Sequence, residues 1–431
     1  MSIKFPPARI GAAALAIAAG LALAACSAPL PGGTESATES TKADGPVKLG
    51  LLAPLTGASA ADGKLMRQGA ELALRELNAA GGVAGREITL EAADVKDLKS
   101  DAVASAVSRL TADGEVGAVI TGYASTTNFE IDLLAEAGVP YLIGGGSTQT
   151  AEIITKDPGR YPGVWSTAPH FEAYKTDLPE RLEAWSRDGT FQPRTRTVYI
   201  ISSDNPYSND ISDGLVRNFT AKGWKVVGPD VVPYGEVNDW TPQIGKIHAA
   251  DPSVIVNLDY LTANAVKFLT QFRDNPTDSL LFSQYAPSVP EFKKLAGRGA
   301  DGVLYNLPVG AVVSDRYAPG RDFVKKFNDA YGTDPGLYGV MGYEQVRLWA
   351  KAAESVGDPL DRAAVGKAVG GVEMRETAMG TIRFDQATHL AVADDTDGLP
   401  LQFFQIQDGR DVLLGPAKYA DGTFELPDWF R

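Results

Sequence analysis

Two clusters of hydroxyl side chains follow two short apolar segments in the first half of the chain. Residues 125–127 (Ser-Thr-Thr) come soon after the apolar run 116–121, and residues 147–148 (Ser-Thr) come soon after the run 139–143. Hydroxyl oxygens placed just before a helix accept hydrogen bonds from its first N–H groups, and the N–H groups left free suit a carboxylate. The pattern therefore predicts an anion-binding site, with simple helix capping as the alternative.

The segments around these clusters indicate how they are positioned. The runs 116–121 and 139–143 are rich in β-branched residues and predict two buried strands, with a helix-length segment between them that ends at Gly138. Ligands of open α/β sheets bind beyond the carboxyl ends of parallel strands. Both clusters are therefore expected at one edge of a sheet, and their repetition favours a binding site more than a single cap would.

The same alternation continues along the rest of the chain. Strands are predicted at 47–53, 88–92, 197–202, 225–232, 254–258, 280–283, 381–384 and 401–406, helices at 65–79, 101–112, 211–221, 241–249, 263–273, 320–331 and 339–356, and a surface tail at 416–431. Strands that alternate with helices form parallel sheets covered on both faces, so the fold class is α/β. A chain of 431 residues exceeds one ordinary core, which predicts two domains.

Three tyrosines follow strands of the second half. Tyr207, Tyr260 and Tyr285 each come at or just past the carboxyl end of a predicted strand. Tyrosines in such places often serve packing only, but three in the same topological position indicate an aromatic wall beside a ligand.

The charge and the cysteine content exclude several classes of function. The formal net charge is −14, which repels phosphate backbones, so no nucleic acid partner is expected. The single cysteine excludes intrachain disulfides and cysteine-based metal clusters, the three histidines are far apart, and no HExxH motif is present. No metal and no cofactor are therefore expected.

The first 26 residues have the features of a targeting segment. Lys4 and Arg9 precede an Ala/Leu run that is weaker than a membrane span, and the segment ends in Leu23-Ala24-Ala25-Cys26. This ending resembles a bacterial lipobox, which implies cleavage before Cys26 and lipid attachment to it; a plain secretory signal with a chance cysteine is the alternative. Residues 27–46 predict a flexible tether, so the body is expected at the outer face of the cytoplasmic membrane or in the periplasm.

The whole body resembles the type 1 periplasmic binding proteins of ABC importers, in the group that binds leucine, isoleucine and valine. The resemblance is carried by residues 47–94, VKLGLLAPLTGASAADGKLMRQGAELALRELNAAGGVAGREITLEAAD, and by the later FVKKFNDAYGTDPGLYGVMGYEQV. It implies two doubly wound parallel-sheet lobes joined by three crossover strands, near 164–168, 305–309 and 381–385. The first lobe would comprise 47–166 plus 308–382, and the second 167–307 plus 383–431.

The resemblance also implies which residues bind the solute. The family serine that takes the ligand carboxylate falls on Ser125, with backbone neighbours Tyr123 and Ala124, and the second loop of that lobe contributes Gly146, Ser147 and Thr148. The two family tyrosines of the second lobe fall on Tyr207 and Tyr260, and Tyr285 joins them. The second lobe would rotate over the bound solute, and a membrane permease would recognise the closed form.

One departure from the family pattern leaves the chemical identity of the solute undecided. Amino-acid binders use a second-lobe glutamate to neutralise the ligand ammonium, whereas this chain has no acid within 282–286. Asp62 or Asp259 could supply the missing charge, since a buried ammonium without a counter-charge is costly. Otherwise the solute is an amide, a urea or an aromatic or aliphatic acid.

Enzyme activity is not expected. Residues 57–65 resemble a phosphate-binding loop, but five residues separate the glycines and Leu65 replaces the needed Ser or Thr. Ser147 lacks the trailing glycine of a hydrolase nucleophile elbow. We expect a monomeric binding protein, with a ligand-sensing regulator and a hydrolase as alternatives of another class.

Overall fold

The computed structural model describes residues 45–430. Strands are β1 (Val47–Ala53), β2 (Ile88–Asp94), β3 (Val116–Thr121), β4 (Tyr141–Ile143), β5 (Val164–Ser166), β6 (Thr197–Ser203), β7 (Lys225–Val232), β8 (Val254–Asn257), β9 (Leu280–Ser283), β10 (Leu304–Leu307), β11 (Met374–Thr377), β12 (Gly380–Ile382), β13 (Gln402–Gln407) and β14 (Arg410–Gly415). Helices are α1 (Ala60–Ala79), α2 (Ser100–Ala112), α3 (Glu130–Glu136), α4 (Thr148–Lys156), α5 (Ala173–Asp188), α6 (Pro206–Ala221), α7 (Thr241–Ala250), α8 (Thr262–Asp274), α9 (Pro290–Ala296), α10 (Ala318–Tyr331), α11 (Gly336–Val356) and α12 (Arg362–Val369), with short 3-10 turns at Pro158–Arg160, Ala286–Ser288 and Gly297–Ala300. Cys26 and most of the predicted tether lie outside the described residues.

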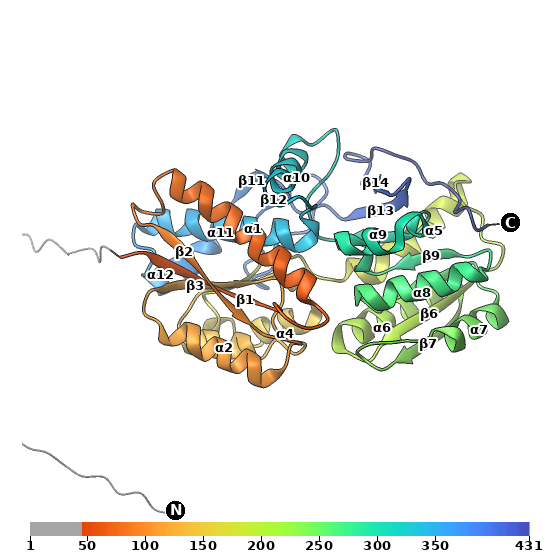
Figure 1. Ribbon diagram of the computed structural model, residues 1–431, viewed down its shortest axis with the longest axis horizontal. Helices are drawn as coiled ribbons and strands as arrows, with labels where there is room; N and C mark the ends of the chain where they lie inside the picture. The colour runs from red at the N-terminus through yellow and green to blue at the C-terminus, as the bar shows by residue number, and fades with distance from the viewer. Residues whose placement is uncertain (1–44, 431) are drawn as a thin grey trace, which may run out of the picture. The chain divides into compact units, whose positions relative to one another are not determined.

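The first lobe is built on a five-stranded sheet with the order β2-β1-β3-β4-β5, in which all neighbours are parallel. Alternate residues of β1 serve the two faces: Leu49 and Leu51 join the core formed with α1 and α11, whereas Leu52 joins the core formed with α2 and α3. A strand buried on both faces needs apolar residues in every register, which is why β1 reads as one continuous apolar run. The helices α1–α4 and α10–α12 surround this sheet (Figure 1).

The second lobe is built on a seven-stranded sheet with the order β14-β13-β10-β9-β8-β6-β7. Its strands β6–β10 are parallel, and β13 and β14 add an antiparallel edge. Val198 and Ile200 of β6 face a core with α5 and α6, and Tyr199 and Ile201 face the core that contains α8.

The chain passes between the two lobes three times. It leaves the first sheet after β5, returns from β10 to α10, and leaves again after β12 to form β13. These passes agree with the two doubly wound lobes that the sequence predicts. The exact lobe boundaries, 47–166 plus 308–382 and 167–307 plus 383–431, remain a prediction.

A close helix contact explains two glycines in the first lobe. A Cβ atom on Gly69 of α1 would lie 1.9 Å from the backbone oxygen of Gly339, and one on Gly342 of α11 would lie 2.4 Å from the backbone oxygen of Met66. Only glycine lets the two helix backbones approach this closely. The late segment that contains α11 is thereby fixed to the start of the body.

Two expectations about the C-terminal part need correction. β14 is a strand that the sequence analysis did not predict, because Arg410 and Asp411 start it with charge on the edge of the sheet. The tail is also more than a surface extension, since Tyr419 and Trp429 are buried and the indole of Trp429 donates a hydrogen bond of 2.9 Å to the Ser279 carbonyl.

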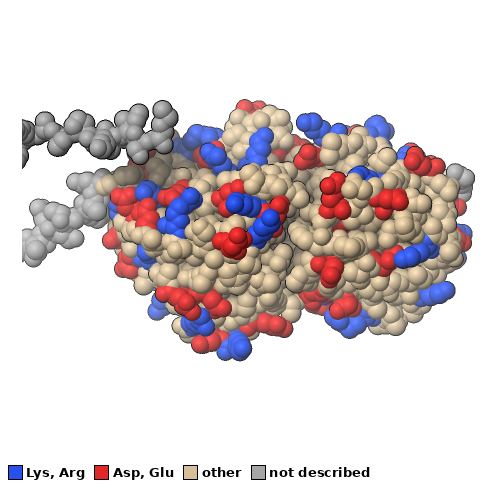
Figure 2. Space-filling view, turned by 60° about the horizontal axis from the view of Figure 1, so that its bottom comes forward, with Lys and Arg blue, Asp and Glu red and all other residues tan. Residues whose placement is uncertain are grey.

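The surface carries both signs of charge. Figure 2 shows acidic and basic side chains interspersed over both halves of the visible face, without a continuous basic stripe. None of the helices within residues 45–430 is long and apolar enough to cross a membrane.

Candidate functional site

A cavity of about 440 Å³ lies where the carboxyl ends of the two sheets face each other. The first lobe contributes the loops after β3 and β4 and parts of α1 and α11, and the second lobe contributes the segments after β6, β8 and β9. Its lining residues are Asp62, Leu98, Gly122, Tyr123, Ser125, Thr126, Asn128, Gly144, Gly145, Ser147, Thr148, Gln149, Glu152, Phe171, Tyr174, Asn205, Pro206, Tyr207, Asp210, Ile211, Tyr260, Tyr285, Val309, Leu337 and Tyr338.

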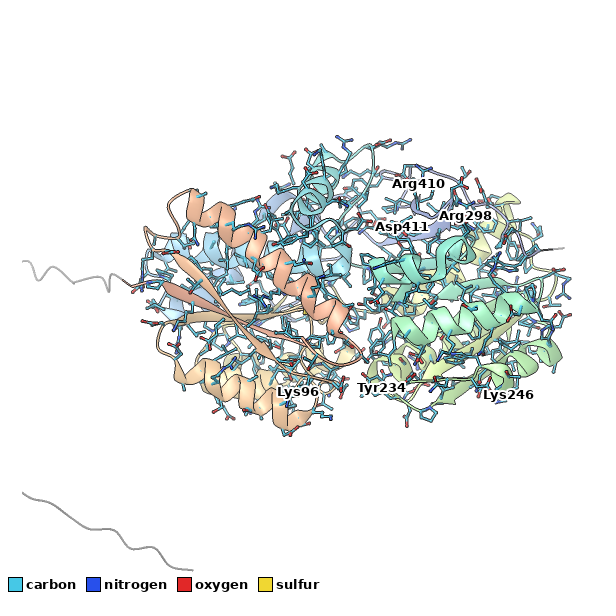
Figure 3. The ribbon with its side chains drawn as sticks, in the orientation of Figure 1. Lys96, Tyr234, Lys246, Arg298, Arg410 and Asp411 are labelled. Atoms are coloured by element: carbon cyan, nitrogen blue, oxygen red, sulfur yellow. The ribbon has the colours of Figure 1, made fainter. Side chains whose placement is uncertain are left out.

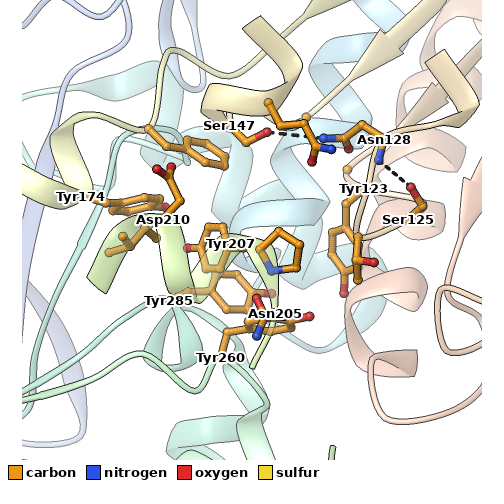
Figure 4. A pocket seen from close by; sticks show the side chains of 18 of the residues that line it. Tyr123, Ser125, Asn128, Ser147, Tyr174, Asn205, Tyr207, Asp210, Tyr260 and Tyr285 are labelled. Carbon is orange, nitrogen blue, oxygen red and sulfur yellow. Dashed lines mark hydrogen bonds between the residues drawn. The ribbon is translucent and has the colours of Figure 1, made fainter. Parts of the chain in front are cut away.

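The two hydroxyl clusters act as helix caps and are bridged by one asparagine. The Ser125 hydroxyl accepts the Asn128 N–H at 2.8 Å, and the Ser147 hydroxyl accepts the Thr150 N–H at 3.1 Å at the start of α4. The Asn128 side chain donates to the Ser147 and Thr150 hydroxyls at 3.4 and 3.1 Å, as Figure 4 shows for Ser147. The two loops are therefore one hydrogen-bonded unit.

A buried glutamate lies directly behind Ser125. The Ser125 hydroxyl is 2.5 Å from Glu130 Oε2, and the Tyr141 hydroxyl donates to Oε1 at 3.3 Å. Burial raises the pKa of Glu130, against the hydrogen bond from Ser125, which lowers it. While Glu130 is ionised, the proton of the Ser125 hydroxyl is directed to it and away from the cavity.

Backbone amides provide the donors that the hydroxyls do not. Among the described residues, the N–H groups of Ser125, Thr126, Thr148 and Gln149 donate to no other group, and all four residues line the cavity. Those of Thr148 and Gln149 lie at the N-terminus of α4, where free N–H groups and the helix dipole favour an anion. This edge of the cavity can hold a carboxylate without a basic side chain.

Aromatic rings form a continuous wall across the cavity. Ring centroids are 5.7 Å apart for Tyr207 and Tyr260, 6.3 Å for Tyr260 and Tyr285, and 5.9 Å for Tyr285 and Tyr338. Phe171 and Tyr174 extend the wall at 5.9 and 6.2 Å from Tyr207. Such a wall favours an apolar or aromatic part of a ligand.

The wall reaches the surface at Tyr234. The Tyr260 hydroxyl lies 3.0 Å from that of Tyr234, which is exposed. Figure 3 shows Tyr234 across from Lys96, which follows β2 of the first lobe. The two lobes thus face each other at this mouth.

A buried carboxylate lies at the end of the wall near the first lobe. Asp62, in the first turn of α1, is 6% exposed and accepts the Tyr123 hydroxyl on Oδ2 at 2.6 Å. Burial raises its pKa to about 6, although the Tyr123 hydroxyl opposes the shift. No lysine, arginine or histidine within residues 45–430 pairs with it.

A second carboxylate joins the two lobes at the other side. Asp210 of α6 accepts the Thr148 hydroxyl of α4 at 3.1 Å and pairs with Lys175 of α5 at 2.9 Å. Lys175 also donates to the Thr148 hydroxyl at 3.2 Å and is 3% exposed. This Thr148–Lys175–Asp210 group links helices of both lobes.

The structure brings most of the predicted site residues together. Asp62, Tyr123, Ser125, Ser147, Thr148, Tyr207, Tyr260 and Tyr285 all line the cavity, whereas Ala124 and Gly146 do not. Ala124 is fully buried in the core below the loop. Gly146 packs so closely on the chain after β5 that a Cβ would lie 1.8 Å from the Pro169 oxygen.

The alternative acid, Asp259, also lies outside the lining. Its carboxylate accepts the Leu261 N–H at 3.0 Å and the Asn264 side chain at 2.8 Å, so its hydrogen bonds are to the segment that leads into α8 and to α8 itself. Burial raises its pKa to about 6 as well. Of the two acids that the sequence offered, only Asp62 faces the cavity.

Several lining residues were missed by the sequence analysis. Tyr174, Tyr338, Phe171, Asp210 and Asn128 come from helices or loop interiors, where a strand-end pattern does not apply. Tyr338 lies in the late segment GLYGVMGY, and only the packing of α11 on α1 brings it to the site. No local signal distinguishes such residues from ordinary helix positions.

The lining offers little for catalysis or metal binding. It contains no histidine, cysteine, lysine or arginine. Within residues 45–430, no group of three His, Cys, Asp or Glu side chains is placed to hold a metal ion. The arrangement can bind a small molecule that has a carboxylate, an apolar part and a positive charge.

Comparison with known proteins gives a consistent assignment. The periplasmic binding protein family matches residues 46–410. The "Leu/Ile/Val-binding protein homolog 3" of Brucella melitensis biotype 1 is 25% identical over 381 residues, which cover 85% of this chain and 93% of that protein. The crystal structure of a protein from Silicibacter pomeroyi, assigned as a branched-chain amino acid ABC transporter, is 30% identical, with a TM-score of 0.79 over 89% of this chain and 100% of that one.

A protein of lower sequence identity has the same fold, and its structure contains benzoate. The solute-binding protein of an ABC transporter from R. palustris, in complex with benzoate, is 19% identical, with a TM-score of 0.70 over 89% of this chain and 99% of that one. The family match covers most of the body and agrees with both sheets and with the cavity between them. The chain therefore belongs to the periplasmic binding protein family and is a substrate-binding protein of the ABC transport type.

Proposed function

We propose that this protein captures an amino acid of the branched-chain or a related type and delivers it to an ABC permease. The observation that carries the proposal is that the two lobes contribute different kinds of groups to one cavity. Free backbone amides of the first lobe form one side, and an aromatic wall, mostly from the second lobe, forms the other. The names of the relatives from Brucella and Silicibacter support an amino acid as the solute.

The proposed binding mode begins at the first lobe. The solute carboxylate accepts hydrogen bonds from the N–H groups of Ser125, Thr126, Thr148 and Gln149, and its side chain lies against Tyr207, Tyr260 and Phe171. Rotation of the second lobe then excludes water, and the closed form is populated when solute is present. The Thr148–Asp210 contact is one of the contacts that this closure makes.

An acid without an ammonium group is the second candidate. The buried Gln284 occupies the region where amino-acid binders place an acid, and its side-chain nitrogen lies 3.5 Å from the Tyr207 hydroxyl. The aromatic wall would accept an aryl ring equally well. An amide or an aromatic acid would use the same loop amides.

We further propose that a lipid attached to Cys26 anchors the protein to the membrane. The lipobox ending at Cys26 supports attachment of the body to the outer face of the cytoplasmic membrane, where the permease lies. Residues 27–46 would act as the tether, and the protein would act as a monomer. Metabolic labelling with a fatty acid should mark the wild type and leave Cys26→Ser unlabelled; equal labelling would contradict the proposal.

The test of the main proposal is a ligand screen. A ligand that binds only the folded state raises the melting temperature, so thermal shifts should identify leucine, isoleucine, valine or phenylalanine among amino acids, amides, urea and aromatic acids. Isothermal calorimetry should then give one site per chain. A shift by benzoate or an amide, with none by any amino acid, would replace the main proposal by the second candidate.

A further inference from the structure

Asp62 stands out because its carboxylate pairs with no basic side chain within residues 45–430. It is buried, it lines the cavity, and no basic side chain within residues 45–430 reaches it. A buried carboxylate without a cation is costly, and proteins keep such groups where a ligand supplies the missing charge. The cavity lining contains the acids Asp62, Glu152 and Asp210 and no basic side chain, and within residues 45–430 only Asp210 of these three pairs with a base, Lys175.

Three tyrosines surround this carboxylate from three different elements. Tyr123 follows β3, Tyr285 follows β9 of the other lobe, and Tyr338 belongs to α11. The rings of Tyr123 and Tyr338 are 5.1 Å apart, and those of Tyr285 and Tyr338 are 5.9 Å apart. Aromatic faces attract an organic cation, which adds to the attraction of the carboxylate.

A second observation points to a ligand at the same place. The Tyr285 hydroxyl is buried and makes no hydrogen bond of full geometry within residues 45–430, although it lies near enough to the Asp62 carboxylate to lower the pKa of that group. Tyr285 itself is 6% exposed and lines the cavity. A buried hydroxyl is rarely left without a partner, so an acceptor or a donor is expected there when the site is filled.

From these contacts we infer that Asp62, Tyr123, Tyr285 and Tyr338 form a binding site for the ammonium group of the solute. We call these four residues the ammonium box. The inference rests on the proposed function and adds that the counter-charge comes from α1 of the first lobe. The first lobe then holds both charged ends of an amino acid, while the second lobe supplies Tyr285.

This assignment makes Asp62 a specificity-determining residue. A solute that lacks the ammonium would leave the box carboxylate buried and unpaired, and it would therefore bind more weakly than its amino-acid counterpart. Removing the charge of Asp62 should abolish this preference without closing the cavity.

The experiment compares three probes that differ only in their charged ends: L-leucine, 4-methylpentanoate, which lacks the ammonium, and 3-methylbutylamine, which lacks the carboxylate. Calorimetry on the wild type should show leucine binding about 100-fold or more tightly than 4-methylpentanoate, because truncating one partner of a buried charge pair has an effect of this size. In Asp62→Asn, leucine affinity should fall to the level of 4-methylpentanoate, whose own affinity should stay equal or rise.

Glu354→Gln is the charge control. Glu354 lies on α11 outside the cavity lining, is exposed and makes no ion pair within residues 45–430. Its replacement removes one negative charge away from the cavity, so leucine affinity should change less than threefold. The melting temperature of Asp62→Asn should equal or exceed that of the wild type, which separates lost binding from lost folding.

The possible results of this experiment test the ammonium box and the proposed amino-acid capture separately. Equal leucine affinity in the wild type and Asp62→Asn overturns the box and leaves amino-acid capture intact. Equal affinity of the wild type for leucine and 4-methylpentanoate overturns the box and favours the second candidate. Binding of 3-methylbutylamine without leucine supports the box and overturns amino-acid capture, and binding of neither overturns both.

Discussion

Asp62 and Asp210 line the same cavity, and they differ in what balances their charge. Asp62 is buried beside three tyrosines and has no cation in the described part of the chain, whereas Asp210 is partly exposed and pairs with the buried Lys175. Figure 4 shows Tyr123, the partner of Asp62, and Asp210 on opposite sides of the cavity. The comparison teaches that a paired acid serves the structure, while an unpaired buried acid is available to a charged ligand.

The two regions also differ in which lobes they join. The Thr148–Lys175–Asp210 group connects α4 to α5 and α6 through direct hydrogen bonds. The ammonium box also spans both lobes, but within residues 45–430 the Tyr285 hydroxyl makes no hydrogen bond of full geometry. The first region thus has direct hydrogen bonds between the lobes, whereas the second has space for a hydrogen bond to the solute.

The largest loss of stability is expected when Asp210 loses its cation and becomes an unpaired acid like Asp62. Lys175→Met removes the cation beside Asp210, and it should lower the free energy of unfolding by about 2–3 kcal/mol, less than for a fully buried pair because Asp210 is partly exposed. Urea unfolding measures this value. Lys64→Met is the control, since Lys64 is exposed and has no ion pair among the described residues; an equal loss in both variants would contradict the role of the pair.

Removal of the unpaired charge of Asp62 should stabilise the solute-free protein. The pKa of Asp62 is raised from 3.8 to about 6 in the folded state, so the folded state binds more protons between these values and stability falls as the pH rises through this window. The whole shift corresponds to about 3 kcal/mol, of which about 0.5 kcal/mol is already present at pH 4, so Asp62→Asn should raise the free energy of unfolding by about 2.5 kcal/mol more at pH 8 than at pH 4. Unfolding at both pH values checks this; a gain of equal size at pH 4 would rule out the titration of Asp62 as its cause.

Solute binding should depend on pH in the same window. The groups near Asp62 are the hydroxyls of Tyr123, Tyr285 and Tyr338 and the carboxylate of Glu291, and burial raises the pKa of all three tyrosines, so they stay neutral. Leucine affinity should thus rise about tenfold from pH 5 to pH 7, as Asp62 loses its proton.

Calorimetry along this pH series tests the expectation on the wild type and on Asp62→Asn. The variant should show a flat profile, because it keeps the tyrosines and Glu291 but has no titrating group at position 62. A tenfold rise in the variant as well would assign the pH effect to another group.

The smallest expected loss of leucine affinity comes from removing the Thr148–Asp210 contact between the lobes. Thr148→Val removes the hydroxyl that donates to Asp210 and keeps the shape of the side chain, so leucine affinity should fall about fivefold, or about 1 kcal/mol. Thr155→Val is a control on the same helix, since the Thr155 hydroxyl bonds only to the Ala151 carbonyl. An unchanged affinity in Thr148→Val would show that the contact does not contribute to closure.

Much of the fold could be predicted from local patterns. The strands at 116–121 and 280–283 have the predicted bounds, because continuous β-branched and apolar runs are needed wherever both faces of a sheet are covered. The edge strand at 225–232 also has the predicted bounds, although only Val232 of its residues is buried. β14 was missed because it starts with two charged residues at the sheet edge. The burial of Trp429 was missed because its partners, Ser279 just before β9 and Phe272 of α8, are distant in the sequence.

The sequence by itself determined the α/β class and the position of the cavity beyond the strand ends, since strand ends and caps are marked locally. Eight predicted residues line the cavity, and two of them, Asp62 and Tyr123, were predicted from the family resemblance alone. Only the tertiary structure decided that Ala124 and Gly146 stay outside the cavity, that Tyr338 enters it, and that Asp62 is unpaired while Asp210 is paired. Burial and charge pairing depend on neighbours from distant segments and from both lobes, and no local pattern records those neighbours.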